Sequence, residues 1–369
     1  MRHSRAILAV LILTLVAACA PRGVITLDPA AATIGRVHRI FVSTTRAPNG
    51  AGGFDSKRDP APSYGRYDIS VPPSHRLGRI EWPHGQVVPT HDFLTTQAVR
   101  FSSATAFSDA LRSALHRRPT ARREVVVYVH GFNNNFAEGL YRMAQMSDDF
   151  DLPGVAVHYS WPSAANPLGY GYDRDSVLFF CDGLIELMAA VKAAGAHRIL
   201  LVGHSMGALL VMEALRQTAI AERRDLRRLL AGVVLFSPDI DIGVFREQAA
   251  RIGALPQPFV IFTSRRDRAL RLSARLTGQK QRLGNITDVS ALAKLRVTVF
   301  DVTEFTDSAL GHFTPATSPA LISILQKLNR IDAAFRSDRS GRIGLLPGAV
   351  LTVQNATKII LAPTLNRQR

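Results

Sequence analysis

The chain has 369 residues, of which 47% are hydrophobic and 20% are charged, and its formal net charge at pH 7 is +16. This apolar share is ample for one large domain with its own core plus extensions. Cys19 and Cys181 are the only cysteines, which excludes a small disulfide-stabilised scaffold, and no Cys/His cluster suggests a metal, so we expect no metal and no cofactor.

The first 18 residues are typical of a secretory signal peptide. Arg2 and Arg5 precede an apolar run over residues 6–16 that is too short to cross a bilayer comfortably. The run ends in Val-Ala-Ala followed by Cys19, which resembles the lipobox of bacterial lipoproteins. That resemblance implies a lipid anchor on Cys19, and Ala20 after it implies the outer membrane of a two-membrane cell, facing the periplasm. Cleavage after Ala18 without lipidation is the alternative.

The opening part of the mature chain predicts a linker and an antiparallel edge. Residues 19–35 contain Pro and Gly and are assigned to the linker, and the main domain is expected over residues 36–336. Val37 to Ser43 and Tyr67 to Val71 have the composition of strands, with a Gly- and Pro-rich stretch between them. We therefore expect an antiparallel N-terminal edge on the sheet.

From residue 123 onward, short apolar runs alternate with helical patterns, which favours an α/β fold. The runs lie at 125–129, 155–159, 199–202, 233–236, 259–263 and 297–300. The helical patterns lie at about 136–149, 174–194, 208–222, 243–253 and 318–335. Such alternation predicts a mostly parallel sheet with helices on both faces.

The most informative stretch joins a buried strand to a helix through Gly203-His204-Ser205-Met206-Gly207. This Gly-x-Ser-x-Gly pattern is typical of a nucleophile elbow, in which a serine sits on a sharp, strained turn and small residues avoid a collision with neighbouring chain. An idle serine in a glycine turn is the alternative. The flanking apolar strand and helix formers favour Ser205 as a nucleophile.

The general base is predicted from chain order. Elbow hydrolases place the acid and then the histidine after the serine. Of the 11 histidines only His312 follows Ser205, and it lies in a loop after the apolar run 297–300. His312 is therefore the candidate base, with an ordinary surface-loop histidine as the alternative.

Several aspartates are candidates for the acid that orients this histidine. Asp267 is favoured because it follows the second strand-like run after the elbow. Asp239 and Asp241 follow the first such run and are the runners-up, whereas Asp301 lies on the last predicted strand and is expected to cap a turn. A helix-capping role is the alternative for Asp267.

Two backbone amides are expected to form an oxyanion hole for the tetrahedral intermediate. One belongs to Met206, directly after the nucleophile. The other belongs to Phe132, in the loop after the predicted strand 125–129. Gly131 allows that loop to turn tightly, and His130 is expected to brace the loop rather than to transfer protons.

Taken in order, these motifs resemble the α/β-hydrolase superfamily over about residues 36–335. A narrower resemblance to a little-characterised bacterial branch of esterase/lipase-like hydrolases rests on Phe41–Arg46, Tyr159–Ser163, Ser237–Asp241 and Ser264–Asp267. This branch implies hydrolysis of carboxylic esters, with a small-molecule or lipid ester as substrate. The run Leu168–Tyr172 departs from the pattern. Trp161 and Tyr170 are candidates for an acyl pocket, with core packing as the alternative.

The C-terminal part of the sequence is compatible with two structures. Residues 337–369 are assigned to a C-terminal extension whose β-branched stretch 350–361 forms either a hairpin or a disordered end.

The net charge of the chain is strongly positive. Without Arg2 and Arg5, 43 basic residues stand against 29 acidic ones, a net charge of +14. This surplus favours anionic lipid over nucleic acid as a partner, unless it reflects an arginine-rich composition alone. The pattern does not determine the oligomeric state.

Three other enzymatic activities use the same catalytic residues as an esterase, and a binding function without catalysis is a further alternative. Thioesterase, amidase and acyltransferase reactions proceed through the same acyl-enzyme, so the residues do not separate them from esterase activity. A lipid-anchored envelope protein that keeps the scaffold only for binding is the rival. The presence of a nucleophile, a base, an acid and an oxyanion loop together favours the hydrolase.

Overall fold

The computed structural model describes residues 22–49, 53–120, 123–306, 311–326, 348–353 and 356–361. The predicted signal peptide and the predicted lipid-bearing Cys19 lie outside these residues. Within the described part of the chain, no helix combines the length and the apolarity needed to span a bilayer.

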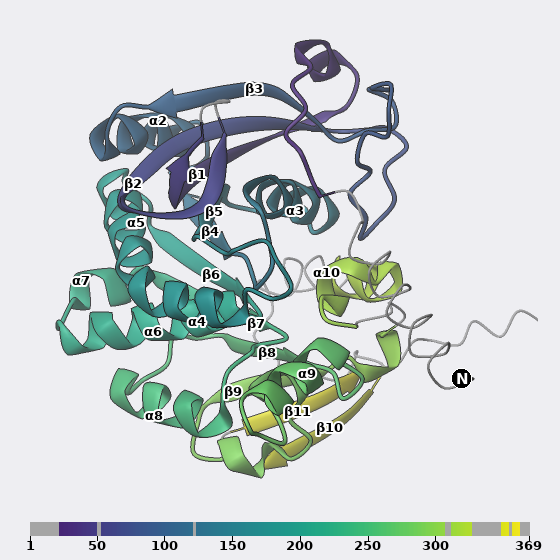
Figure 1. Ribbon diagram of the computed structural model, residues 1–369. Coiled ribbons are helices and arrows are strands. Elements are labelled where there is room, and N and C mark those ends of the chain that lie inside the picture. The colour runs from purple at the N-terminus through teal and green to yellow at the C-terminus, as the bar shows by residue number, and fades with distance from the viewer. Residues whose placement is uncertain are drawn as a thin grey trace, which may run out of the picture.

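Eleven strands of the described residues form one sheet in the order β10-β11-β9-β8-β7-β6-β4-β5-β1-β2-β3 (Figure 1). The strands are β1 (Arg36–Pro48), β2 (Phe54–Val71), β3 (Leu94–Phe101), β4 (Glu124–Val129), β5 (Val155–Ser160), β6 (Arg198–His204), β7 (Leu230–Phe236), β8 (Phe259–Thr263), β9 (Val297–Asp301), β10 (Gly348–Val353) and β11 (Ala356–Leu361).

The central strands are parallel and the N-terminal edge is antiparallel, which confirms the predicted fold class. Strand β1 pairs parallel with β5 but antiparallel with β2, and β2 pairs antiparallel with β3. Strand β4 shows why the central runs are continuously apolar. Its Val125, Val127 and Val129 enter one buried cluster, whereas Val126 and Tyr128 enter the other. Both faces of the strand are therefore buried, as a parallel sheet covered by helices requires.

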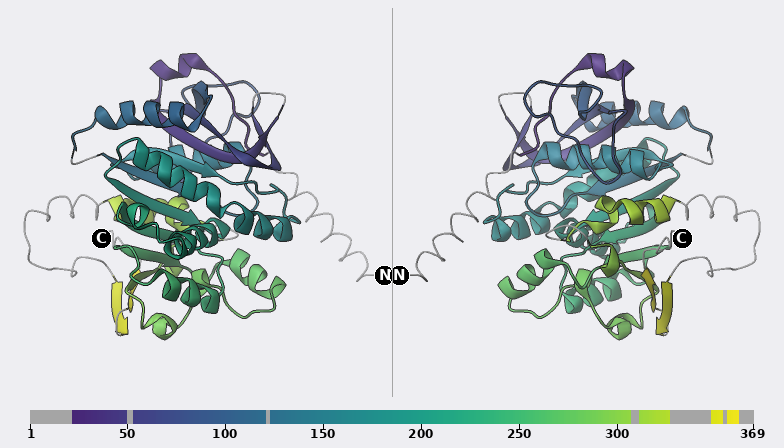
Figure 2. Two further views of the ribbon diagram at one scale, coloured as in Figure 1. Left: turned by 90° about the vertical axis from the view of Figure 1, so that its left-hand side faces the viewer. Right: turned by 90° about the vertical axis from the view of Figure 1, so that its right-hand side faces the viewer.

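Helices cover both faces of this sheet (Figure 2). They are α2 (Ala104–His116), α3 (Phe136–Asp149), α4 (Tyr170–Phe179), α5 (Cys181–Ala193), α6 (Met206–Ile220), α7 (Arg224–Arg227), α8 (Ile242–Ile252), α9 (Arg268–Leu276) and α10 (Thr314–Thr317). Helices α2, α5, α6 and α8 contribute to one apolar cluster, and α3 contributes to the other. The chain is thus a three-layer α/β domain.

The fold differs from the predicted pattern at several elements. Strand β3 and helix α2 had no prediction. The helix expected over 174–194 is two helices that meet at Phe180, whose carbonyl accepts a hydrogen bond from the Tyr159 hydroxyl at 2.7 Å. The helix expected over 318–335 is described only as far as residue 326.

Both ends of the described chain pack on the domain. Strand β11 pairs parallel with β9, so the hairpin of β10 and β11, within the stretch assigned to the C-terminal extension, extends the sheet beyond the last predicted strand. At the other end, the stretch assigned to a linker includes the short 3₁₀ helix Pro29–Thr33, in which Ala31 is buried, and Leu27 forms a bridge to Thr95 on β3.

Candidate active site

Ser205 lies on a strained turn between β6 and α6. Its backbone angles are φ 55° and ψ −120°, in a region that side-chain-bearing residues rarely adopt and that costs about 1–3 kcal/mol. The flanking glycines make the turn possible, because a Cβ on Gly207 would lie 2.2 Å from the His130 carbonyl oxygen and one on Gly203 would lie 2.8 Å from Ala208 Cα. The surrounding structure therefore holds the serine in the geometry that the elbow pattern predicts.

The structure brings Asp267 and His312 together. Asp267 Oδ2 lies 2.8 Å from His312 Nδ1, and the aspartate is fully buried. Its other oxygen, Oδ1, accepts the Leu270 amide at 2.9 Å and so caps α9. The same carboxylate thus contacts the histidine and caps the helix, the two possibilities that the sequence left open.

Electrostatics at this pair favour a protonated imidazole. Burial disfavours the charged form of His312, but the Asp267 charge and hydrogen bond outweigh it and raise the pKa of His312 above its usual value. The imidazole side chain keeps 19% of its surface exposed. It is therefore both accessible and stabilised as a cation, as a general base requires after it takes a proton.

His312 also lies beside the elbow. Its carbonyl oxygen is 3.3 Å from Nε2 of His204, the residue before Ser205, and the two imidazole rings are 4.8 Å apart. Among the described residues, no hydrogen bond of 3.5 Å or less joins the Ser205 hydroxyl to His312. Such contacts are often long in ligand-free sites and shorten when substrate binds.

The other aspartates have different partners. Asp239 bonds Arg282 and Ser273, each at 2.6 Å, and Asp241 caps α8 through the Val244 amide. Asp301 Oδ2 forms an ion pair with Lys358 Nζ at 3.1 Å, and Asp301 Oδ1 accepts a hydrogen bond from the Thr303 amide at 3.1 Å. Among the four aspartates, all of which the structure describes, only Asp267 forms a hydrogen bond with the His312 imidazole.

The predicted oxyanion amides flank the elbow. A Cβ built on Gly131 would lie 2.8 Å from Ser205 Cβ, so the loop that carries Phe132 lies against the turn that carries Ser205. Met206 is the first residue of α6, where backbone amides have no partner within the helix. Among the described residues, neither the Met206 nor the Phe132 amide has a protein acceptor. Both are available to a developing negative charge.

His130 and Trp161 form a buried brace. Their rings stack 4.9 Å apart, and Trp161 Nε1 donates to the His130 carbonyl at 2.7 Å. Burial, with the Arg46 charge, lowers the pKa of His130 well below its usual value. A neutral, fully buried imidazole cannot exchange protons with a substrate, and the buried Trp161 belongs to this brace rather than to a pocket wall.

Sequence reasoning missed two charged residues that hold the oxyanion loop. Arg46 is buried and donates to the carbonyl oxygens of Asn134 at 2.7 Å and Ser163 at 3.0 Å. Asp173, at the start of α4, accepts the Asn133 amide at 3.1 Å and the Ser163 hydroxyl at 2.6 Å. Burial lowers the Arg46 pKa to about 10, so it remains charged at neutral pH. In the sequence, Arg46 was marked only as the last residue of the segment Phe41–Arg46.

The N-terminal end of the described chain reaches the same loop. Arg22 donates to the side-chain oxygen of Asn133 at 2.9 Å and to its carbonyl at 2.8 Å, and it pairs with Glu138 at 2.6 Å. Glu138 also forms a reciprocal capping box with Asn135 at the start of α3. We refer to the contacts of Arg22 with Asn133 and Glu138 as the Arg22 clamp.

A second polar network connects α9 to the site. The Tyr170 hydroxyl lies 3.1 Å from Asp239 Oδ2 and 2.7 Å from the Ser273 hydroxyl, and its ring packs 5.6 Å from that of Phe132. The Asp239 amide donates to the Ser205 carbonyl at 3.1 Å. Tyr170 thus links α9 to the oxyanion loop.

A cluster of ligand-type atoms lies where the parallel strands begin, away from Ser205. The ligand atoms of His75, Asp148 and Asp149 fall within 4.8 Å of one another. Nε2 of His75 already bonds Asp149 at 2.9 Å and Nδ1 bonds Glu81 at 2.9 Å, while Asp148 pairs with Arg36 and with a second histidine. Hollows of about 620 and 700 Å³ lie beside these residues. The ligand atoms are occupied by hydrogen bonds that join β1, α3 and the loop after β2.

Comparison with known proteins places the fold. A family described as "Alpha/beta hydrolase of unknown function (DUF900)" matches residues 103–330. No curated protein matches the chain.

Three similar solved structures are distant from this chain. A predicted CIB-like hydrolase from Thermoplasma acidophilum is 15% identical, with 58% of this chain and 89% of that chain covered and a TM-score of 0.36. The esterase Est22 is 14% identical, covering 92% and 89%, with a TM-score of 0.36. An esterase from Pyrococcus furiosus is 12% identical, covering 84% and 96%, with a TM-score of 0.36. Since the family match spans more than half of the chain, the protein belongs to this family of α/β hydrolases.

Proposed function

We propose that the protein is a serine hydrolase that cleaves carboxylic esters through Ser205, His312 and Asp267. The observation that carries the proposal is the 2.8 Å contact between buried Asp267 and His312, next to a serine held at φ 55°. A surface-loop histidine or an idle serine needs neither the buried carboxylate nor the strained backbone.

The reaction proceeds in two halves. His312 takes the proton from the Ser205 hydroxyl as its oxygen attacks the ester carbonyl carbon, and Asp267 stabilises the imidazolium that forms. The Met206 and Phe132 amides donate to the oxyanion of the tetrahedral intermediate. His312 then gives the proton to the leaving alcohol. In the second half a water molecule, deprotonated by His312, attacks the acyl-enzyme, and the carboxylic acid leaves as the proton returns to Ser205.

The experiment is labelling of the purified protein with a fluorophosphonate probe, which reacts with an activated serine without requiring the natural substrate. Labelling is expected for the wild type and lost in Ser205→Ala and His312→Ala. The matched controls are Ser113→Ala and His116→Ala, both on α2 and exposed, which should label as the wild type does. A folded wild type that remains unlabelled would favour the binding-protein alternative.

We further propose that Cys19 carries a lipid and anchors the protein to the outer membrane, facing the periplasm. The support is the signal-like segment and the Val-Ala-Ala-Cys sequence at residues 16–19. Metabolic labelling with an alkyne-tagged fatty acid is expected to mark the wild type and not Cys19→Ala, and the wild type should fractionate with outer membranes. Equal labelling of both proteins would rule out Cys19 as the attachment site.

A further inference from the structure

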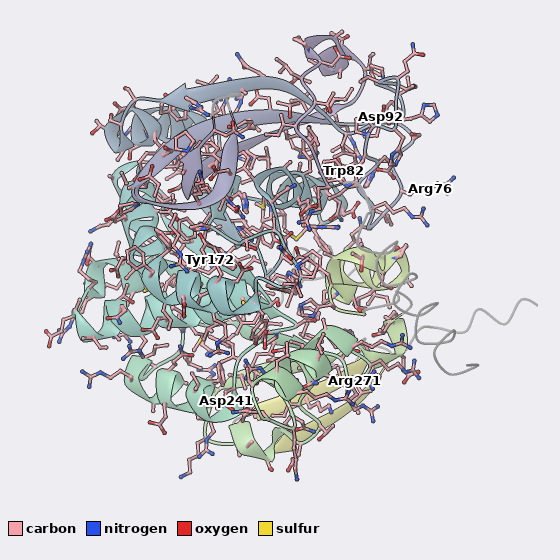
Figure 3. All side chains as sticks on the ribbon, viewed as in Figure 1. Arg76, Trp82, Asp92, Tyr172, Asp241 and Arg271 are labelled. Atoms are coloured by element: carbon pink, nitrogen blue, oxygen red, sulfur yellow. The ribbon has the colours of Figure 1, made fainter. Side chains whose placement is uncertain are left out.

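Helix α9 has one buried face and one exposed face. Its buried residues are Leu270, Ser273 and Ala274. The exposed residues are Arg268, Arg271, Leu272, Arg275 and Leu276. Because their spacing is i, i+3, i+4, i+7 and i+8, these five side chains share one face of the helix. We call them the α9 stripe. Leu272 is 58% exposed and Leu276 is 63% exposed, and Figure 3 shows Arg271 on the outer surface of the helix.

The charge around this stripe is one-sided. Residues 265–282 contain seven basic residues and one acidic residue, the buried Asp267. Three of the flanking arginines pair with carboxylates: Arg265 with Asp301, Arg266 with Glu304 and Arg282 with Asp239. In the described part of the chain, the arginines of the α9 stripe form no salt bridge. No carboxylate among the described residues therefore lies within salt-bridge distance of these arginines.

The stripe lies beside the candidate active site. Helix α9 starts directly after Asp267, and Ser273 on its buried face contacts Tyr170, which packs on Phe132 of the oxyanion loop. The loop before Tyr170 exposes Leu168, which is 93% accessible. Exposed leucines and arginines thus border the residues that would bind a substrate.

We propose that the α9 stripe is a docking surface for an anionic lipid bilayer. Arginines between exposed leucines on one helix face are the composition of helices that lie in a membrane interface, where cations meet headgroup phosphates and apolar side chains enter the acyl boundary. A nucleic-acid surface would combine the basic residues with aromatic side chains that stack on bases, and this stripe has none. Docking brings lipid esters to the site. That consequence rests on the proposed function, whereas docking itself does not.

The test measures binding to vesicles with the chain from residue 20 onward, which retains all described residues and lacks Cys19. Sedimentation with phosphatidylcholine vesicles containing 30% phosphatidylglycerol is compared with pure phosphatidylcholine. The stripe variants are Arg271→Gln/Arg275→Gln and Leu272→Ser/Leu276→Ser. The control is Arg224→Gln/Arg228→Gln on and next to α7, with the same loss of charge on a helix that lies at the left edge of Figure 1, whereas α9 lies in the lower centre. Midpoints of thermal unfolding verify that every variant folds.

We expect the wild type to bind the anionic vesicles and to lose binding as ionic strength rises. Loss of two arginines near the surface should weaken partitioning about 25-fold, about fivefold for each. The leucine variant should also weaken binding, and the α7 control should change it by less than about threefold, because its charges lie away from the contact.

Several outcomes would overturn the proposal. Equal losses in the stripe and α7 variants would show that net charge alone drives binding. Unchanged binding of the stripe variants, or binding to single-stranded DNA but not to vesicles, would also overturn it. Ser205→Ala should bind vesicles as the wild type does. Vesicle binding without hydrolysis of any ester would therefore contradict the proposed function but still support the docking surface.

Discussion

Asp267 bonds two partners at once: Oδ2 lies 2.8 Å from His312 Nδ1, and Oδ1 accepts the Leu270 amide at the start of α9. The helix thereby fixes the carboxylate, and the carboxylate fixes the imidazole. The orientation of His312 therefore depends on α9 through Asp267, which lies 45 residues before His312 in the chain.

Asp267→Asn keeps the shape of this side chain and removes its charge. The amide can still cap α9, but it cannot stabilise the His312 cation, so kcat for a soluble ester should fall about 10³- to 10⁴-fold. The midpoint of thermal unfolding should stay close to that of the wild type, because the cap of α9 is retained. Asp301→Asn is the comparison, since that carboxylate does not contact His312, and a kcat for Asp267→Asn near that of the wild type would exclude Asp267 as the orienting acid.

The pH dependence of kcat/KM follows from the raised pKa of His312. The imidazole acts as a base only when neutral, so activity should rise with pH through a midpoint above the ordinary histidine value of about 6.5. In Asp267→Asn the residual activity should have a lower midpoint, because burial lowers the His312 pKa and the larger opposing charge, that of Asp267, is gone while only the weaker effect of Asp239 remains. A midpoint that does not move between the two proteins would contradict this assignment.

The Arg22 clamp should support the loop that carries Phe132. Arg22→Ala removes three hydrogen bonds to Asn133 and Glu138, so the oxyanion amide is held less firmly and kcat should fall about 3- to 10-fold with little change in KM. Arg36→Ala is matched to it, because Arg36 also pairs with a carboxylate of α3, Asp148, but at the other end of the helix. A change confined to KM, or an equal loss of kcat in both variants, would show that Arg22 does not support the loop that carries Phe132.

Gly207→Ala tests the close approach at the elbow. The new Cβ would lie 2.2 Å from the His130 carbonyl oxygen, so the backbone must move, which should lower the free energy of unfolding by about 1–3 kcal/mol or more and reduce fluorophosphonate labelling. Gly171→Ala, in α4 with no atom within 4 Å of its added Cβ, should instead stabilise by about 0.5–1 kcal/mol. Denaturant unfolding measures both, and similar values would argue against the steric account.

His75 should make stability depend on pH above neutrality. Burial disfavours its charge, but hydrogen bonds with Asp149 and Glu81 raise the His75 pKa to about 9. Because the folded pKa exceeds the unfolded value of 6.5, the stabilisation is complete below pH 6.5 and is lost as pH rises through about 9. Between pH 6 and 10 the wild type should lose up to about 3 kcal/mol more unfolding free energy than His75→Gln.

The control for this measurement is His84→Gln, since His84 is exposed. Its unfolding free energy should follow that of the wild type across the same pH range. If His75→Gln also follows the wild type, the two carboxylates do not hold the His75 proton in the folded state.

Sequence patterns predicted the parts of the fold that depend on neighbouring residues. The two-sided burial of β4 appears as an unbroken apolar run, and α3 was predicted over residues 136–149 from its periodicity. The strand order was not readable in this way, because β11 joins β9 through an interface between segments far apart in the chain. Strand β3 lacked a signal of its own, since its exposed edge residues dilute the alternation.

Within the candidate site, the sequence by itself determined two positions. Ser205 was recognised by Gly203 and Gly207 on either side of its turn, and His312 was recognised as the one histidine after it. Tertiary structure decided which of several aspartates meets that histidine, and it brought Arg46 and Arg22 to the oxyanion loop. The physical reason is range. A strained turn is encoded by residues within it, whereas a hydrogen bond across 45 or 111 residues exists only after packing has placed both partners.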